Sequence, residues 1–407
     1  MARILHTADW HLGARLVEQE RTDEHTHFLA WLLHEMELLR PDLLVIAGDV
    51  FDSANPPQTA LAQYYSFLAG VVDRTKTEVL VLGGNHDSAL TLNAPRELLR
   101  SLRIRVVGAA PEDPADGLLQ SADTVVCAVP YLRERDVRQA AAGQTFEQVA
   151  AEIREGLVRH YRRALERARS VAGDRAIVAT GHLTAVGANA SASERPMHIG
   201  GLGAVPTDCF DGFAYVALGH FHRPQCVGSD RIRYSGSPLA LGFDEADSAK
   251  EVTVIDVSAP DQVVIQPVPI PCFRSLLRLK CRMGALAETL SSAVSAGTDL
   301  QPWVELTIED GSQHPDVDRE VRAVARNHPI TVLKLIVPQA EQANGADDAF
   351  AGRVLAEIRP EEVFAERLRR GGIEPSSEVG IELMGTFAEL LSKMQDAQSV
   401  HPIIPAK

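Results

Sequence analysis

Short apolar runs of the kind that form buried strands recur along the first two-thirds of the chain, with helical patterns between them. Five of these runs lead, directly or through one or two glycines, into Asp, Asn or His residues: 4–8, 43–47, 79–82, 176–180 and 214–218. Alternating strands and helices predict an α/β fold. Open α/β sheets place their sites at the carboxyl ends of the strands. We therefore expect a functional site where these five strands end.

The helices between the strands are marked by their ends. A helix is predicted over 22–39, capped by Thr22 or Asp23 and stopped before Pro41, and a second over 57–72 begins at a proline. Further helices are predicted over 95–102 and 146–170, and further strands over 104–107, 125–129, 232–234, 252–257 and 263–268. Residues 110–120 and 185–206 are predicted loops, and the second is long enough to indicate a functional one.

A smaller unit follows, with the order strand, helix, strand, helix, strand. Its predicted elements are 275–282, 285–296, 303–308, 317–327 and 330–336. The first strand alternates apolar residues with Arg278, Lys280 and Arg282, which gives it one basic face. That face either meets a phosphate backbone or is neutralised by Glu305 and Glu309 on a neighbouring strand.

The remainder of the chain is predicted to be a linker followed by helices. The linker is rich in Ala, Gln, Asn, Asp and Gly. One helix follows Pro360 and ends at Gly371, and the next carries Met384, Phe387, Leu391 and Met394 at helical spacing. The predicted domains are 1–271 as the α/β core, 272–337 as the smaller unit, 338–352 as the linker and 353–407 as a helical segment.

Composition restricts the class of protein further. No apolar run is long enough to cross a bilayer, so we expect no membrane association. The five cysteines are odd in number and never form a C-x-x-C pair, which argues against disulfides or a zinc ribbon and for a reducing cytoplasm. No G-x-x-x-x-G-K-S/T loop is present, so we expect this chain to bind no nucleotide itself.

The net charge of −15 leaves the substrate open. An acidic protein grips nucleic acid only through a local basic face or a basic partner. Six arginines crowd the predicted helix 146–170, but Glu155 and Glu166 are interleaved with them, so we interpret this as a solvated helix face.

The strand ends supply a candidate metal site. Its seven predicted ligands are Asp9, His11, Asp49, Asn85, His182, His220 and His222. Oxygen and imidazole ligands without a thiolate suit Mn²⁺, Fe²⁺ or catalytic Zn²⁺. Two divalent ions can share such a set if one carboxylate bridges them, and Asp49, on a middle strand, is the natural bridge. Two ions about 4 Å apart clamp a phosphoryl group and activate a water, so the set predicts a phosphoester hydrolase.

Three further residues lie beside these ligands. His86 follows Asn85 directly and is a candidate to donate a proton to the leaving oxygen. Asp52 and Asp87 are candidates to orient ligand imidazoles, although Asp87 as a helix cap is an equal alternative. The other nine histidines are interpreted as surface or core residues, and only His198 stays a candidate for the site.

The ordered motifs resemble the calcineurin-like metallophosphoesterase superfamily. They are Asp9-x-His11, Gly48-Asp49-x-x-Asp52, Gly84-Asn85-His86-Asp87, Gly181-His182 and Gly219-His220-x-His222. Longer blocks closely resemble the SbcD family of bacterial nuclease subunits: HTADWHLG from residue 6, AGDVFDS from 47, GNHDSALTLN from 84, ATGHLTAVGA from 179 and ALGHFH from 217. The similarity extends to about residue 271, and beyond it only length and element order agree.

This resemblance implies a four-layer α/β/β/α core that binds two Mn²⁺ ions, with Mg²⁺ as a substitute. It assigns one ion to Asp9, His11, Asp49 and His222, the other to Asp49, Asn85, His182 and His220, and catalysis to His86. It implies a small α+β capping domain that touches DNA. It also implies that residues 353–407 dock on SbcC, a coiled-coil ATPase. A homodimer within a heterotetramer, located in the cytoplasm at the nucleoid, is the expected assembly. Asp52 departs from archaeal and eukaryotic members, which often carry histidine there, and this puts a catalytic duty for Asp52 in question.

Three functions compete. The leading hypothesis is a metal-dependent DNA nuclease subunit, an exonuclease on double-strand ends and an endonuclease on hairpins and single strands, which works with an SbcC-type ATPase in repair and recombination. The alternative is a stand-alone phosphatase or small-molecule phosphodiesterase, which would not need residues 272–407. A scaffold without chemistry is opposed by the full ligand set.

Overall fold

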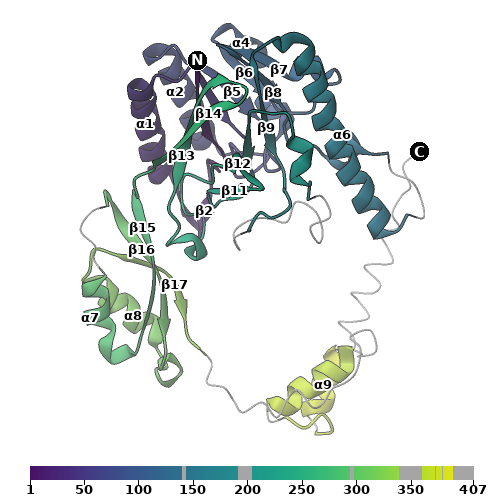
Figure 1. Cartoon of the computed structure of the whole chain (residues 1–407). Helices are drawn as coiled ribbons and strands as arrows, with labels where there is room; N and C mark the ends of the chain where they lie inside the picture. The colour runs from purple at the N-terminus through teal and green to yellow at the C-terminus, as the bar shows by residue number, and fades with distance from the viewer. Residues whose placement is uncertain are drawn as a thin grey trace. The chain divides into compact units, whose positions relative to one another are not determined.

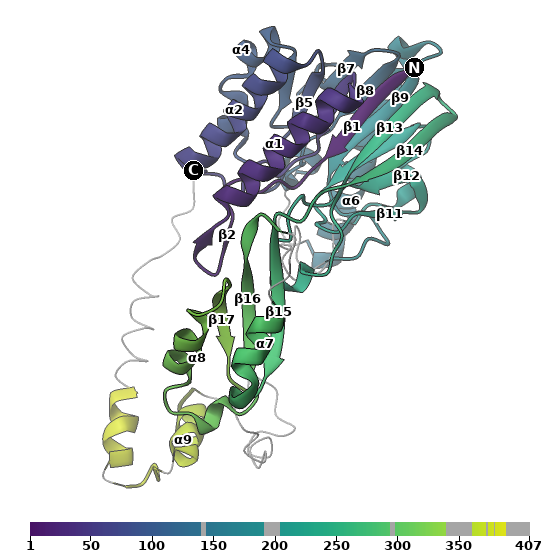
Figure 2. The ribbon, with the colours of Figure 1, turned by 90° about the vertical axis from the view of Figure 1, so that its left-hand side faces the viewer.

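The computed structural model describes residues 1–139, 144–190, 204–293, 298–338, 360–371, 373–377 and 379–387. The chain divides into two compact units, Met1–Pro338 and Gln339–Lys407. The first unit contains two six-stranded sheets and a three-stranded sheet, all shown in Figures 1 and 2. Among the described residues, no helix has the length and apolarity that a membrane span requires.

The first large sheet has the strand order β14-β13-β1-β4-β5-β6. Its strands are β1 (Ala2–Thr7), β4 (Leu43–Ile46), β5 (Glu78–Leu82), β6 (Ile104–Val107), β13 (Glu251–Ala259) and β14 (Gln262–Pro269). β1, β4, β5 and β6 run parallel, so their carboxyl ends share one edge, while β13 and β14 pair antiparallel. The intervening helices are α1 (Thr22–Leu39), α2 (Gln58–Arg74), α3 (Ala89–Asn93) and α4 (Arg96–Ser101). Trp10, Phe28 and Phe67 are buried in the core that α1 and α2 form with this sheet.

The second large sheet has the order β11-β12-β10-β9-β8-β7. Its strands are β7 (Leu118–Ser121), β8 (Thr124–Ala128), β9 (Ala176–His182), β10 (Tyr215–Gly219), β11 (Gln225–Val227) and β12 (Ser229–Tyr234). β8, β9, β10 and β12 are parallel. The long helix α6 (Phe146–Ala172) packs on the outer face through residues such as Ile153, Leu157 and Tyr161.

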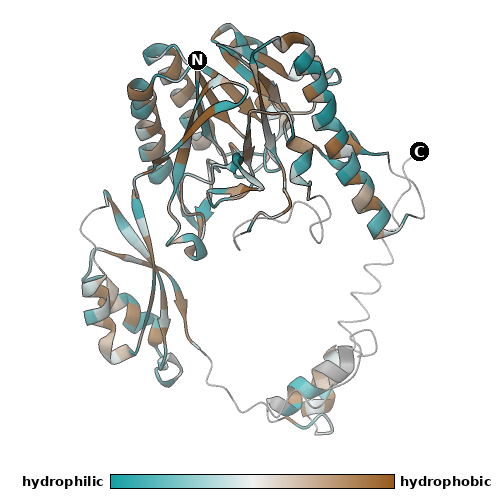
Figure 3. Cartoon of the chain, viewed as in Figure 1, coloured by the Kyte–Doolittle hydropathy of each residue, from teal (hydrophilic) through white to brown (hydrophobic). Residues whose placement is uncertain are grey.

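A third apolar cluster lies between the two large sheets. It contains residues from both, including Ile4, Leu80, Val126 and Val178. Figure 3 shows the strands of both sheets as largely hydrophobic, whereas the covering helices carry hydrophilic and hydrophobic residues along their length. Helices outside and two sheets inside make four layers, which confirms the predicted α/β/β/α core.

The small sheet is all parallel, in the order β15-β16-β17. Its elements are β15 (Arg274–Cys281), α7 (Leu286–Ser292), β16 (Leu300–Ile308), α8 (Val317–Ala325) and β17 (Thr331–Ile336), in the predicted order. Lys280 pairs with Glu309 at 2.9 Å, and Lys334 pairs with Glu305 at 2.7 Å. Neighbouring carboxylates therefore neutralise part of the basic face, which was one of the two interpretations of this sheet.

The second unit has two described helical stretches, α9 (Pro360–Arg370) and residues 379–387. The rings of Phe364 and Phe387 stack between them, with centroids 4.2 Å apart. Leu391 and Met394 of the predicted stripe, and residues 339–352 of the predicted linker, lie outside the described residues.

The prediction of a loop over residues 110–120 holds only for residues 110–113. A 3₁₀ turn (Pro114–Gly117) is followed by β7, which pairs antiparallel with β8. β7 is an edge strand, so only one side of it forms a ladder, and its short sequence has little pattern of its own. The hairpin of β2 (Arg15–Leu16) and β3 (Gln19–Glu20), helix α5 (Glu134–Val137), helix α3 and strand β11 were also not predicted, because each is very short.

Candidate metal centre

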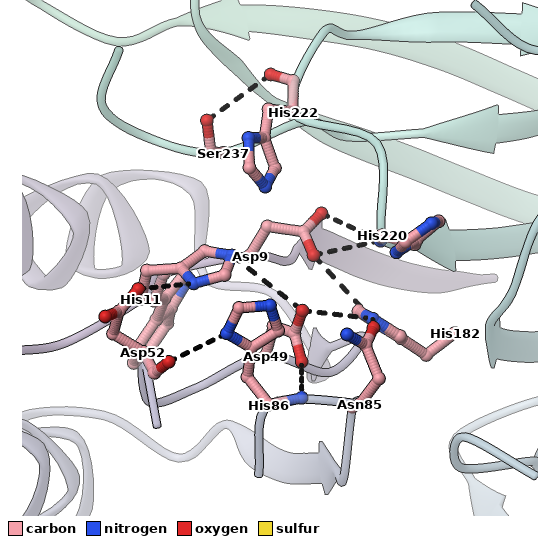
Figure 4. Close-up of polar contacts among 12 residues, drawn as sticks. Asp9, His11, Asp49, Asp52, Asn85, His86, His182, His220, His222 and Ser237 are labelled. Carbon is pink, nitrogen blue, oxygen red and sulfur yellow. Dashed lines mark hydrogen bonds and ion pairs between the residues drawn. The ribbon is translucent and has the colours of Figure 1, made fainter. Parts of the chain in front are cut away.

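The carboxyl ends of the two large sheets bring the predicted residues together, as Figure 4 shows. Asp9 and His11 follow β1, Asp49 and Asp52 follow β4, Asn85 and His86 follow β5, His182 ends β9, and His220 and His222 follow β10. Residues from distant parts of the sequence thus share one site, since the two sheets face each other with their parallel strands ending on the same side.

Four of these residues adopt left-handed backbone conformations. Asp9 has φ 54°, His11 has φ 47°, Asp49 has φ 48° and His220 has φ 110°. A non-glycine residue in a sparsely populated region costs about 1–3 kcal/mol, and such strain concentrates at functional sites. All four of these positions are proposed ligands, so the backbone strain coincides with the candidate site.

At two positions directly before proposed ligands, only glycine leaves enough room for a neighbouring side chain of the site. A Cβ on Gly48 would lie 2.3 Å from His182 Nδ1, and Gly48 itself has φ +92°. A Cβ on Gly84 would lie 2.1 Å from Asp49 Oδ1. Any larger residue at either position would displace a proposed ligand, which gives a physical reason for the Gly-Asp and Gly-Asn pairs.

Asp49 lies at the centre of the site. Its Oδ2 is 3.2 Å from His182 Nε2 and 3.8 Å from His11 Nε2. Two groups of side chains could each hold a metal ion, namely Asp9, His11 and Asp49, and Asp49, His182 and His220. Asp49 belongs to both groups, which is the geometry that a bridging carboxylate requires.

A backbone carbonyl group fixes the orientation of the His182 ring. Its Nδ1 lies 2.9 Å from the carbonyl oxygen of Ala47. Since a carbonyl only accepts, Nδ1 carries a proton, and Nε2 faces the site, 2.9 Å from Asn85 Oδ1. Burial alone would lower the pKa of His182, but the charges of Asp49 and Asp9 raise it to about 9. Against the same opposing effect of burial, His182 holds the pKa of Asp49 well below its usual range.

These residues fit a divalent ion. His11 Nε2 is buried and has no hydrogen-bond partner among the described residues. Two buried carboxylates, Asp9 and Asp49, also face this nitrogen, and buried anions need a compensating cation. Oxygen and imidazole donors without sulfur match the chemistry of Mn²⁺ and similar ions.

His86 lies beside this centre. Its backbone N–H donates to Asp49 Oδ1 at 2.8 Å, and its Nδ1 donates to the carbonyl oxygen of Asp52 at 2.7 Å. The other ring nitrogen, Nε2, is therefore the one left for a substrate. The carboxylate of Asp52 lies 3.3 Å from His11 Nδ1, as expected of a residue that orients a ligand. His11, Asp52 and His86 form a third group with ion-binding geometry.

Asp87 does not cap a helix, so that interpretation is wrong. Ser88 is the N-cap of α3, where its hydroxyl accepts from Thr91 N. The buried carboxylate of Asp87 instead accepts backbone N–H groups from Val50, Phe51 and Gly84 at 2.9–3.1 Å. It ties the turn after β4 to the turn after β5, so it positions both loops instead of contacting an imidazole. Burial, followed by the charge of Asp49, raises the pKa of Asp87 to about 6.

The residues behind His222 were not predicted. Glu245 Oε1 lies 3.0 Å from His222 Nδ1, and Lys250 and Ser237 complete a buried group around it. Glu245 lies well beyond His222 in a segment without a regular pattern, so only the folded chain reveals this contact. His198 lies outside the described residues.

Comparisons with known proteins agree with this geometry. The family of calcineurin-like phosphoesterases matches residues 2–224. A second family, the type 5 capsule protein repressor C-terminal domain (SbcD_C), matches residues 272–371.

Whole-length relatives are similar as well. The D subunit of the nuclease SbcCD from Bacillus subtilis is 34% identical over 405 residues, which cover 97% of this chain and 99% of that protein. The D subunit of the nuclease SbcCD from Escherichia coli K12 is 32% identical over 391 residues, or 94% of this chain and 97% of the relative. The corresponding D subunit from Rhodobacter capsulatus is 34% identical over 391 residues, covering 89% of this chain and 93% of the relative.

Proposed function

The chain belongs to the family of nuclease SbcCD D subunits, and we propose that it is the DNA-cutting subunit of a complex with an SbcC-type ATPase. It is a metal-dependent nuclease subunit built on a calcineurin-like phosphoesterase domain. We propose that it degrades double-strand ends and cuts hairpins and single strands in DNA repair and recombination. The observation that carries this proposal is the carboxylate of Asp49, which lies in two ion-binding groups at once.

We propose that two Mn²⁺ ions occupy the site, with Mg²⁺ as a substitute. Asp9, His11, Asp49 and His222 would hold one ion, and Asp49, Asn85, His182 and His220 the other. The absence of sulfur ligands from this set and the mixture of carboxylate, amide and imidazole support Mn²⁺.

Each protein group has a separate task in the proposed reaction. Ions held there would supply Lewis-acid stabilisation of the phosphoryl oxygens and would lower the pKa of a water. In the hydrolysis a water oxygen forms a bond to phosphorus while that water loses a proton to the solvent, and the bond from phosphorus to the leaving sugar oxygen breaks. His86, held through Nδ1 by the carbonyl of Asp52, has its other ring nitrogen available to give the leaving oxygen a proton. Asp87 holds the two loops that carry Asp49 and His86.

The proposed binding partners of this chain follow from its membership of the family of nuclease SbcCD D subunits. DNA is the proposed substrate, and residues 353–407 are the proposed docking segment for the ATPase. The stacked Phe364 and Phe387 support a small helical hairpin there, and this hairpin belongs to the unit separate from Met1–Pro338. A homodimer within a heterotetramer, in the cytoplasm at the nucleoid, is the proposed assembly, and the five free cysteines are consistent with a reducing compartment.

Helix α6 is a candidate surface for DNA, because it carries several exposed arginines. Its exposed arginines are Arg154, Arg159, Arg162, Arg163, Arg167 and Arg169. None of the ion pairs within the described residues includes Arg162 or Arg163, whereas Lys280 of the small sheet is paired with Glu309. We therefore propose α6 as a phosphate-contacting surface, in place of the solvated face that the sequence suggested.

Cleavage of a hairpin DNA by the purified chain with Mn²⁺, compared with cleavage of a generic phosphomonoester, tests the function. We expect the DNA to be cut and the phosphomonoester to remain nearly intact. The reverse preference would favour a stand-alone phosphatase.

Deletion of residues 353–407 tests the docking segment. The truncated protein should keep metal-dependent nicking of single-stranded DNA, because every proposed ligand precedes the deleted residues. It should no longer capture the ATPase. Capture that survives the deletion contradicts the assignment.

A further inference from the structure

A network of hydrogen bonds between buried polar groups positions His222. Its Nδ1 bonds Glu245 Oε1 at 3.0 Å, and Glu245 Oε2 accepts from Lys250 Nζ at 2.7 Å. The same ammonium donates to the carbonyl oxygen of His222 and to Ser237 Oγ, both at 3.0 Å. Lys250 thus contacts the backbone of His222 directly and its ring through Glu245. Glu245 is completely buried, and Lys250 is 9% exposed.

This arrangement determines which ring nitrogen of His222 can bind an ion. A carboxylate accepts hydrogen bonds and does not donate them, so the proton of His222 resides on Nδ1. Nε2, on the far side of the ring from Glu245, is then the nitrogen that would bind an ion. Carboxylates that orient metal-binding histidines in this way change metal affinity by about 10- to 100-fold when removed.

The short turn that carries Glu245 also packs against the small sheet. This turn, η4 (Phe243–Glu245), places Phe243 in an apolar cluster with Leu16, Leu276 and Trp303. Leu276 is on β15 and Trp303 is on β16. The two ends of one 3₁₀ turn therefore contact the small sheet and the ligand His222.

Ionic contacts fix the same junction. The guanidinium of Arg274, on β15, lies 4.3 Å from the ring centroid of Trp303 and donates to Glu24 of α1 at 2.9 Å. Arg21 also pairs with Glu24, and it donates to the carbonyl oxygen of Ala240 at 2.8 Å. The segment leading into η4 is thus tied to the contact between α1 and the small sheet.

We propose that Glu245 and Lys250 are positioning residues, which orient His222 for the ion that it binds. We also propose that, through η4, the affinity for this ion depends on the packing of the small sheet. The proposal rests on the proposed function for the presence of two ions. A role in stability alone is a weaker account, because a buried ion pair stabilises a fold little compared with apolar residues of similar volume. Arrangement of a ligand, in contrast, requires these polar atoms at these positions.

The first test measures Mn²⁺ binding by calorimetry on the full chain without DNA. The double variant Glu245→Leu with Lys250→Met leaves no uncompensated charge, and it should weaken one of two sites by about 10- to 100-fold while the other is unchanged. Glu245→Gln keeps an acceptor and should give a smaller loss at the same site. Folded variants that bind both ions with wild-type affinity overturn the proposal. A wild-type chain that binds no ion would instead refute the proposed function.

The second test distinguishes a specific effect of the small sheet on the His222 site from a general loosening of the fold. Trp303→Ala touches no proposed ligand, yet it should weaken the same site by several-fold because it removes the support of Phe243. Leu290→Ala, in the separate core of the small sheet, is the matched control and should leave both affinities unchanged. Asp256→Asn, which breaks the Arg3 ion pair between β1 and β13, should also leave them unchanged. Unaltered binding in Trp303→Ala, or an equal loss in Leu290→Ala, contradicts the coupling.

Discussion

The backbone N–H of His86 donates a 2.8 Å hydrogen bond to the carboxylate of Asp49, so the proposed catalyst is tied by its main chain to the proposed bridging ligand. Replacement of the imidazole leaves this bond in place. We therefore expect His86→Ala to retain its metal content and to lose cleavage by about 10²- to 10⁴-fold, the usual contribution of a general acid. Asp49→Ala should lose metal as well. Metal analysis after gel filtration distinguishes the variants, and equal metal loss in both would show that His86 is a ligand.

Gly84 offers a test of the close packing at the site. A Cβ there would lie 2.1 Å from Asp49 Oδ1, so Gly84→Ala must displace the shared carboxylate. Mn²⁺ affinity should fall at both sites together. Gly284→Ala is the matched control, because no atom lies within 4 Å of its added Cβ. Wild-type affinity in Gly84→Ala would mean that Asp49 is not confined as the structure shows it.

Two buried histidines that are not proposed ligands predict acid sensitivity. Burial lowers the pKa of His6 to about 3 and that of His25 to about 4. In the unfolded chain both histidines take up a proton near pH 6.5, while in the native state both rings stay neutral. The contribution of the two histidines to the free energy of unfolding is therefore complete above pH 6.5 and is lost as the pH falls. Each histidine should lower the free energy of unfolding by about 1.4 kcal/mol per pH unit in this range.

Urea unfolding between pH 6.5 and 5 measures this slope. Substitution of both histidines by Gln should flatten the pH dependence, whatever the substitution does to stability at pH 7. An unchanged slope would show that these rings titrate alike in the folded and unfolded chain.

The arginines of α6 predict a specific salt effect on DNA binding. Arg162→Glu with Arg163→Glu should weaken binding of duplex DNA, and the slope of log affinity against log salt should decrease by about 0.9 for each phosphate that is no longer neutralised. Lys280→Glu, at a position already paired with Glu309, is the control and should change the slope less. A larger effect from Lys280→Glu would place the DNA-binding surface on the small sheet.

The sequence predicted most of this site because its signals are local. A buried strand that leads into Gly-His or Gly-Asp, such as β9 with Gly181 and His182 at its end, can be recognised without knowledge of the rest of the fold. Parallel strands then bring these ends to one edge. The order of elements in the small sheet was predictable for the same reason, since each strand and helix has a clear period.

The remaining features depend on tertiary contacts. Glu245 reaches His222 only because the chain returns after β12, and no spacing rule links them. Asp87 was compatible with a cap or with an orienting carboxylate, and Ser88 takes the cap position in the folded chain. β7 forms because β8 offers a free edge, a partner that lies outside its own sequence.

A metal titration with cleavage followed in the same sample tests the central claim most directly. Metal-free chain is titrated with Mn²⁺ while bound metal per chain and the cutting of a hairpin DNA are recorded together. The two-ion account predicts no cutting in chelator and full activity only when the second equivalent binds. Cutting that persists in chelator, or an inactive chain with both ions bound, would contradict it.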